Sequence, residues 1–351
     1  MKTYLVTGGA GFIGSNFVKY MLEKYDDISI INLDKLTYAG NLENLDSVKD
    51  DKNYTFVHGD ICDSTLVEKI FADHDIDYVV NFAAESHVDR SIREPEVFVK
   101  TNILGTVTLL NAAKNAWADG DSFKSGKKFL QVATDEVYGA LGSTGFFTET
   151  TPLNPHSPYS ASKASADLVV KSYYDTYKMP INITRCSNNY GPYQFPEKLI
   201  PLMINNCLNH KKLPIYGDGL NVRDWLYVED HCKAIDIVIN KGVLGEVYNV
   251  GGHNERTNIQ IIETVIDYIN KNVDSSVDRS LMEFVEDRKG HDRRYAIDPA
   301  KIKAELGWEP ETCFEDGIVL TIEWYVKNKK WMENVTSGAY QNYYNEYYKG
   351  I

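Results

Sequence analysis

The chain of 351 residues is 43% hydrophobic and 25% charged, which is ordinary for a globular protein with a substantial core. Its 37 Lys and Arg against 50 Asp and Glu give a net charge of −13, which argues against a nucleic-acid partner or an anionic membrane partner. The five scattered cysteines lack CxxC spacing, so we expect reduced thiols in a cytoplasmic protein without a metal site. No apolar run nears the roughly 20 residues that span a bilayer, and we expect no signal peptide before the first glycine loop.

The first half of the chain alternates short apolar runs with stretches that carry apolar residues at helical spacing. The expected strands are 4–7, 28–33, 55–58, 78–82, 129–133 and 181–185, with one more at 247–250. The expected helices include 14–24, 102–117 and 159–177. Alternation of strand and helix implies right-handed crossovers, so we expect an α/β fold with a doubly wound parallel sheet of the Rossmann type.

Prolines and glycines interrupt this alternation after about Asn188. The change indicates a second, smaller and discontinuous domain that covers the strand ends of the first domain. We expect the first, nucleotide-binding domain to comprise residues 1–187 and 224–252. We expect the second, substrate-binding domain to comprise residues 188–223 and 253–351.

Gly8, Gly11 and Gly14 follow the first expected strand and open a helix. Glycines at this spacing allow a tight turn and close approach of a pyrophosphate, which the helix N-terminus then favours. Asp34 ends the second expected strand, where a carboxylate can accept hydrogen bonds from the adenosine ribose and repel a 2′-phosphate. Together these features predict NAD binding over NADP, and they outweigh a purely structural glycine turn. Asp60-Ile61, at another strand end, fits either an adenine contact or an ordinary turn.

Tyr159 and Lys163 are four residues apart, so they share one face of the expected helix. A nearby ammonium and the positive nicotinamide ring would both lower the pKa of the phenol from its usual value of about 10. Tyr159 could then take a proton from a sugar hydroxyl while hydride leaves the same carbon. A surface Tyr/Lys pair near a helix start is the alternative, and the nucleotide-binding pattern favours the functional interpretation.

Thr134, Asp135 and Glu136 place two carboxyl groups where an expected buried strand ends. Oxidation of C4 of a hexose makes the C5 proton acidic, so Glu136 could act as base while Asp135 protonates the departing C6 hydroxyl. Hydride would return to C6 and a proton to C5, with net loss of water. Thr134 is placed to hydrogen-bond the C4 hydroxyl. Taken alone, the two carboxyl groups would be interpreted as a solvated strand end.

The glycine pattern and the Tyr159/Lys163 pair resemble those of the extended short-chain dehydrogenase/reductase family, whose members act on nucleotide sugars. Over almost the whole chain the resemblance narrows to the dTDP-glucose 4,6-dehydratase branch, through the stretches 34–41, 83–91, 134–139, 188–192, 223–228 and 290–295. It implies conversion of dTDP-glucose to dTDP-4-keto-6-deoxyglucose and water with NAD, in deoxysugar biosynthesis such as that of dTDP-rhamnose. It also implies a homodimer formed through 102–117 and 159–177.

The resemblance assigns catalysis to Thr134, Asp135, Glu136, Tyr159 and Lys163. The NAD contacts that it implies are Gly8, Gly11, Phe12, Ile13, Gly14, Asp34, Lys35, Leu36, Thr37, Asp60, Ile61, Phe82, Ala83, Ala84, Ser86, Thr101, Tyr159, Lys163 and Asn189. The substrate contacts that it implies are Ser86, Thr134, Asn188, Lys198, Leu199, Pro214, Ile215, Tyr216, Arg223, Asn258, Arg288 and His291.

Four of these substrate contacts, Lys198, Arg223, Arg288 and His291, would supply positive charge for a sugar diphosphate in an acidic protein. Lys198 taken alone fits a surface ion pair better. Lys289 stands where the family pattern has proline.

Two alternatives remain at this stage. A sibling 4-epimerase or decarboxylase would act on another nucleotide sugar, but an epimerase needs no acid/base pair after Thr134. A non-catalytic NAD-binding regulator need not keep the phenol, the ammonium and both carboxyl groups together. The sequence leaves open whether the nucleotide base is thymine or uracil.

Overall fold

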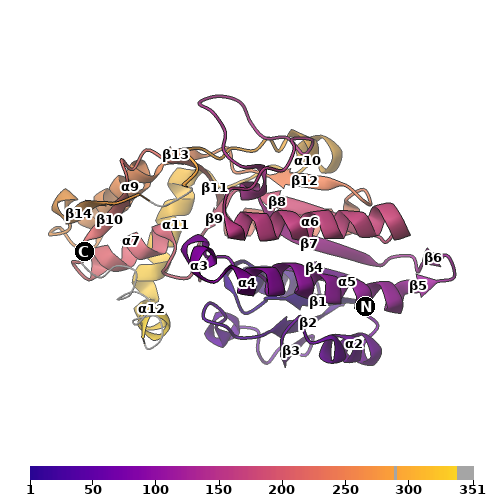
Figure 1. Cartoon of the computed structure of the whole chain (residues 1–351). Helices are drawn as coiled ribbons and strands as arrows, with labels where there is room; N and C mark the ends of the chain where they lie inside the picture. The colour runs from indigo at the N-terminus through magenta and orange to yellow at the C-terminus, as the bar shows by residue number, and fades with distance from the viewer. Residues whose placement is uncertain (288–290, 338–351) are drawn as a thin grey trace.

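Seven parallel strands form the central sheet, in the order β12-β8-β7-β4-β1-β2-β3 (Figure 1). The structure is a computed structural model that describes residues 1–287 and 291–337. The seven strands are β1 (Lys2–Thr7), β2 (Ile28–Asp34), β3 (Tyr54–His58), β4 (Tyr78–Asn81), β7 (Lys128–Thr134), β8 (Ile181–Cys186) and β12 (Val247–Val250). All seven were expected from the sequence, and the parallel, doubly wound fold is confirmed.

Helices cover both faces of this sheet because successive strand residues point to opposite sides. In β1, Tyr4 and Val6 pack against one helical layer, whereas Leu5 packs against the other. The first layer contains α1 (Phe12–Lys24) and α8 (Val228–Lys241). The second layer contains α2 (Ser64–Asp73), α5 (Thr106–Trp117) and α6 (Pro158–Tyr177). Their buried side chains hold the sheet between two apolar layers. Figure 1 shows the helices α5 and α6 running side by side across one face of the sheet.

The expected helix at 102–117 has a more complex start. Two short helices, α3 (Val88–Arg93) and α4 (Pro95–Phe98), lead into a π-helical segment, η2 (Val99–Gly105), and α5 follows without a break. Asn102 in η2 is buried and exchanges hydrogen bonds with the backbone of Glu85, at 2.8 and 3.0 Å. This tertiary contact ties the helix start to the loop after β4.

A second core lies beside the sheet, at the left in Figure 1. Its strands are β9 (Asn188–Tyr190), β10 (Leu213–Tyr216), β11 (Val222–Tyr227), β13 (Glu255–Thr257) and β14 (Met282–Val285). Its helices are α7 (Leu199–Leu208), α9 (Asn258–Asn272), α11 (Phe314–Lys327) and α12 (Lys329–Thr336). In contrast, α10 (Ala300–Leu306) packs into the core of the sheet through Ile302. The domain boundaries expected from the sequence stay a prediction.

The remaining elements are short. They are β5 (Ala118–Asp119), β6 (Ser122–Phe123), η1 (Leu42–Leu45), η3 (Asp135–Tyr138) and η4 (Arg279–Leu281). Across residues 1–287 and 291–337, every helix is too short or too polar to cross a lipid bilayer.

The fold brings the carboxyl ends of β1, β2, β4, β7 and β8 to one edge of the sheet. Ligands of doubly wound proteins bind at this edge, where the strand order reverses between β1 and β4. The backbone is tight there. A Cβ on Gly8 would lie 2.7 Å from the nitrogen of Ala83, and one on Gly14 would lie 2.4 Å from the carbonyl oxygen of Gly8. Glycine is therefore required at both positions.

Phe129 on β7 is fully buried between the sheet and the α5/α6 layer. We expect Phe129→Ala to lower the free energy of unfolding by about 3–5 kcal/mol, because it removes a large apolar side chain and leaves a cavity. Urea unfolding followed by circular dichroism measures the change. Leu320→Ala on α11, where half of the side chain is exposed, should change stability by less than about 0.5 kcal/mol. Equal losses for both variants would contradict this account of the core.

Candidate active site

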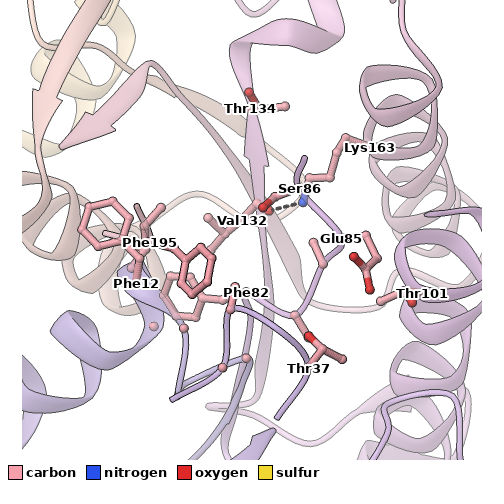
Figure 2. A pocket seen from close by; sticks show the side chains of 18 of the residues that line it. Phe12, Thr37, Phe82, Glu85, Ser86, Thr101, Val132, Thr134, Lys163 and Phe195 are labelled. Carbon is pink, nitrogen blue, oxygen red and sulfur yellow. Dashed lines mark hydrogen bonds between the residues drawn. The ribbon is translucent and has the colours of Figure 1, made fainter. Parts of the chain in front are cut away.

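A cleft of about 320 Å³ opens at the carboxyl edge of the sheet, a volume within the range of small-molecule sites (Figure 2). All five residues expected to be catalytic line it. So do all the expected cofactor contacts except Leu36. The structure thus gathers into one cleft residues that are spread over most of the first half of the chain.

The glycine loop and the start of α1 form one wall of the cleft. Within the described residues, the N-cap Gly11 supplies no side-chain hydrogen bond to the first turn of α1, so backbone N–H groups there are left for a ligand. Asp34 ends β2, and its two oxygens accept from the backbone nitrogens of Ala10 and Leu36, at 2.9 and 2.8 Å. Both bonds hold the carboxylate in the cleft wall. An anion-binding helix end beside a fixed carboxylate fits a dinucleotide without a 2′-phosphate.

The contacts of Asp60 show an ordinary turn, and the contact with adenine that the sequence also allowed stays a prediction. Its Oδ1 accepts from the backbone nitrogen of Cys62 at 2.9 Å, which makes an ordinary turn. Its Oδ2 lies 2.8 Å from the ammonium of Lys35, and Asp60, Lys35 and Ile61 all line the cleft.

The carboxyl pair lies where β7 passes into the short helix η3. The hydroxyl of Thr134 accepts from the backbone nitrogen of Glu136 and donates to Oδ1 of Asp135, both at 3.3 Å. Asp135 is only 1% exposed, and its Oδ2 has no hydrogen-bond partner among the described residues. Burial, followed by the neighbouring charge of Glu136, raises the pKa of Asp135 well above its usual range. A raised pKa favours the protonated form of the carboxyl group, so this environment suits Asp135 to the role of proton donor.

Tyr159 sits in the first turn of α6, which begins with a capping box. The hydroxyl of Ser157 accepts from the backbone nitrogen of Ser160, and Ser160 Oγ accepts from the backbone nitrogen of Ser157, both at 3.0 Å. One turn further on, Lys163 donates from Nζ to the carbonyl oxygen of Val132 in β7, over 2.7 Å (Figure 2). These contacts place the phenol against the carboxyl pair.

Burial, and next the charge of Glu136, raises the pKa of the Tyr159 phenol well above its usual value. Burial also lowers the pKa of Lys163. The lowering of the phenol pKa that the sequence suggested is thus not produced by the chain alone. A positive charge placed near the phenol would act in the opposite direction and favour the phenolate.

Comparison with known proteins agrees with this geometry. Residues 5–321 match the profile of the family described as GDP-mannose 4,6 dehydratase. A dTDP-glucose 4,6-dehydratase of Xanthomonas campestris pv. campestris is 53% identical, over 97% of this chain and 98% of that protein. The chain belongs to the dTDP-glucose 4,6-dehydratase family.

Solved structures of this family resemble the chain closely. The dTDP-glucose 4,6-dehydratase of Bacillus anthracis str. Ames, in complex with NAD, is 53% identical with a TM-score of 0.86, covering 95% of this chain and 100% of that chain. DesIV of Streptomyces venezuelae, a dTDP-glucose 4,6-dehydratase with NAD bound, is 47% identical with a TM-score of 0.88, covering 95% of this chain and 99% of that chain.

The residues expected to bind the family's substrate fall into two groups. Four of them line the cleft: Ser86, Thr134, Asn188 and Lys198. The others that the structure describes lie outside its lining, namely Leu199, Pro214, Ile215, Tyr216, Arg223, Asn258 and His291. Arg288 and Lys289 fall outside the described residues. The roles of all these residues stay predictions.

Two members of the second group already have partners within the chain. Arg223 packs over the ring of Tyr295 and donates to the carbonyl oxygen of Asp292 at 2.9 Å. His291 Nδ1 lies 2.6 Å from Asp287 Oδ1. A substrate that bound Arg223 or His291 would add to these contacts or exchange with them.

The sequence analysis missed Glu197, a buried carboxylate in the cleft wall. Its Oε1 accepts from the hydroxyl of Tyr38 at 3.0 Å and lies 3.7 Å from the ammonium of Lys198. Lys198 is therefore in an ion pair, as its sequence context alone suggested. It also lines the cleft and donates to the carbonyl oxygen of Ser86. The one sequence feature that pointed to Glu197 as a site residue is its position next to Lys198.

His231 on α8 was also missed, and it holds the cleft residue Asn189. The two groups are 2.8 Å apart, and because the amide oxygen only accepts, Nδ1 of His231 carries the proton. His231 is fully buried, and its Nε2 has no partner within the described part of the chain. Burial lowers the pKa of His231 to about 3.

This burial makes stability depend on pH. Between about pH 3 and 6.5 the unfolded chain binds a proton at His231 that the folded chain does not, so the free energy of unfolding falls as the pH falls. By pH 5 the contribution of His231 should have dropped by about 2 kcal/mol. In urea unfolding, the stability difference between wild type and His231→Gln should shrink by that amount from pH 8 to pH 5. A difference that stays constant with pH would contradict the assignment.

Proposed function

We propose that this chain converts dTDP-glucose to dTDP-4-keto-6-deoxyglucose and water, with NAD as its cofactor. One observation carries the proposal: a buried Asp135, whose pKa is raised by burial, lies beside Glu136 in the same cleft as Tyr159, Lys163 and the glycine loop. Family members that are nearly half or more than half identical over almost the whole chain are dTDP-glucose 4,6-dehydratases, and two are solved with NAD. The reaction is that of a hydro-lyase acting on a nucleotide sugar.

The side chains divide the proton transfers among them. NAD, when bound, takes a hydride from C4 and returns it to C6. Tyr159 takes the proton of the C4 hydroxyl, Glu136 takes the proton from C5, and Asp135 gives its proton to the C6 hydroxyl, which leaves as water. Glu136 then returns a proton to C5. Tyr159 is left with one extra proton and Asp135 with one too few, so a single transfer restores both.

The buried carboxyl pair also separates the proposal from its alternatives. A 4-epimerase neither gains nor loses water and needs no proton donor at C6. Burying a carboxyl group is unfavourable. A non-catalytic NAD-binding protein would therefore have no reason to keep a buried acid beside a base. We further propose that residues 188–223 and 253–351 bind the nucleotide sugar over the cleft, since Asn188 and Lys198 already line it.

Substitution of each carboxyl group tests the proposal. Each general acid or base contributes about 10²–10⁴-fold to the rate, so Asp135→Asn and Glu136→Gln should each lower kcat on dTDP-glucose by at least about 10²-fold. Mass spectrometry follows the loss of water from the sugar nucleotide. Both variants should retain NAD, as measured after denaturation. Asp267→Asn, an exposed carboxylate on α9 paired with Arg279, is the control and should keep wild-type activity. Dehydration at the wild-type rate by both active-site variants would contradict the roles of Asp135 as acid and Glu136 as base.

We also propose that the protein is a homodimer formed through η2, α5 and α6. Large apolar side chains are exposed along this face: Val99, Leu104, Leu168 and Tyr177, of which Leu168 is 61% exposed. These side chains lie on neighbouring elements, because α6 packs against both η2 and α5, and Figure 1 shows α5 and α6 side by side. Exposed large apolar side chains on neighbouring elements support an interface there.

A charge placed on this face should break the dimer. Leu168→Glu should shift the mass in solution from two chains to one, because the interface would have to bury an unpaired carboxylate. Light scattering coupled to size exclusion measures the mass. Leu320→Glu, exposed on α11, should leave it unchanged. A monomeric wild-type protein at micromolar concentration would rule the dimer out.

We propose the cytoplasm as the compartment of the protein. Cys62, Cys186, Cys207, Cys232 and Cys313 are all free thiols, as expected for a reducing compartment.

A further inference from the structure

Residues 292–298 form a strap that joins the two parts of the molecule beside the cleft. On one side its backbone exchanges hydrogen bonds with Val222 of β11, at 2.9 and 3.2 Å. On the other side it exchanges hydrogen bonds with Phe147, at 2.9 and 2.8 Å. Phe147 belongs to the segment 139–157, which connects η3 with α6. The strap is therefore fixed both to the second core and to the chain that carries the catalytic groups.

Asp292 opens the strap and ties it to the start of α6. Nδ1 of His156 lies 2.7 Å from Oδ1 of Asp292, and because a carboxylate oxygen only accepts, Nδ1 is the donor. His156 directly precedes Ser157, the N-cap of α6, and Tyr159 lies in the first turn of this helix. One oxygen of Asp292 is thus bonded to the chain that leads into the catalytic helix.

The other oxygen of Asp292 holds a ring beneath Arg223. Oδ2 accepts from the hydroxyl of Tyr295 at 2.6 Å, and the guanidinium of Arg223 lies 4.3 Å from the centre of the Tyr295 ring. The backbone carbonyl of Asp292 also accepts from Nη2 of Arg223, at 2.9 Å. Asp292 therefore fixes Arg223 in two ways, through its own backbone and through the ring that its carboxylate holds.

The guanidinium of Arg223 keeps donors for a ligand. It carries five N–H groups. Among the described residues it donates to the carbonyl oxygens of Val222 and Asp292, at 2.8 and 2.9 Å. The remaining N–H groups are left in a side chain that is buried in the fold. A buried cation with unused donors suits an anionic ligand such as a diphosphate.

Arg223 also lies near the carboxyl pair of the cleft. Its strand β11 pairs with β9, whose Asn188 lines the cleft. Burial and the charge of Glu136 raise the pKa of Asp135, and the charge of Arg223 is the largest influence in the opposite direction. Burial, and next the charge of Glu136, likewise raises the pKa of the Tyr295 phenol. The group held by Asp292 is thus within electrostatic reach of the proposed acid and base.

We propose that Asp292 is a positioning residue for substrate binding: it holds Arg223 beside the carboxyl pair and joins it to the start of α6 through His156. The inference rests on the proposed function for its ligand, the diphosphate of a nucleotide sugar. An arginine side chain loses much rotamer freedom when it is held in one place. Because Asp292 fixes Arg223 before the ligand arrives, this cost is not charged to binding.

Binding of dTDP to NAD-loaded enzyme tests the proposal without turnover. Asp292→Ala should weaken dTDP binding about tenfold, because it removes both side-chain hydrogen bonds and frees the guanidinium of Arg223. Asp292→Asn should stay within about threefold of wild type, since its amide oxygen can accept from His156 and its amide nitrogen can donate to the Tyr295 oxygen. Isothermal titration calorimetry measures the affinity. KM for dTDP-glucose should follow the same order, with kcat changed by less than about threefold.

Arg293→Gln is the matched control. Arg293 is the next residue of the strap, and its exposed side chain pairs with Asp218 at 2.7 Å. This variant removes an ion pair of the same strap that involves neither Arg223 nor the start of α6. It should bind dTDP as tightly as wild type does.

A double-mutant cycle asks whether Asp292 acts through Arg223. Arg223→Ala should weaken dTDP binding by itself, and adding Asp292→Ala should then weaken it no further, because the group that Asp292 positions is gone. A merely structural role of Asp292 would instead give losses that add.

A second pair of variants serves if Asp292→Ala does not fold. The side chain of His156 is 40% exposed, so its replacement should leave the fold intact. An asparagine carries its amide group where the imidazole carries Nδ1, whereas a glutamine carries it near the position of Nε2. His156→Gln should therefore weaken dTDP binding about threefold, as expected for a partly exposed contact, and His156→Asn should not. Equal affinities for these two variants would contradict the link to α6.

The outcomes separate the two proposals. A folded Asp292→Ala that binds dTDP like wild type, or losses that add in the double variant, would overturn the role of Asp292. A wild-type protein that binds dTDP and does not dehydrate dTDP-glucose would overturn the proposed function alone. The affinities for dTDP would then still decide the role of Asp292.

Discussion

Lys163 reaches across from α6 to the carbonyl oxygen of Val132 in β7, and much of the cleft depends on this 2.7 Å contact. The bond joins the helix that carries the phenol to the strand that ends in Thr134, Asp135 and Glu136. The phenol and the carboxyl pair are thereby held in the same cleft. Small displacements between such groups have large effects on rate, so a rigid link of this kind suits the proposed chemistry.

Burial also shifts the pKa values of the catalytic groups, and the shift has opposite sign for acids and bases. It raises the pKa of Asp135 and Tyr159, and it lowers that of Lys163. Burial thus favours the protonated form of Asp135, as suits a proton donor, whereas positive charge near the phenol would favour the phenolate of Tyr159.

Much of the fold could be predicted from the sequence because its strands are short apolar runs with clear limits. All seven strands of the central sheet were expected, and β12 at Val247–Val250 matched its expected limits. The short strands β10 and β14 were not expected, since four-residue strands carry little periodicity and their pairing is long-range. Likewise, the π-helical start of α5 depends on Asn102 bonding to the backbone of Glu85, a contact that local spacing does not encode.

The sequence by itself determined the nucleotide loop, the order of strands and helices, and the residue types of the catalytic group. Each of these is a matter of local spacing: glycines three apart, Tyr159 and Lys163 one turn apart, and a carboxyl pair at a strand end. Only the tertiary structure decided which of these groups are buried, and hence in which direction their pKa values move. It also brought Glu197 into the cleft and His231 beside it. Protonation depends on the surroundings in space, and those surroundings come from chain segments that the sequence leaves far apart.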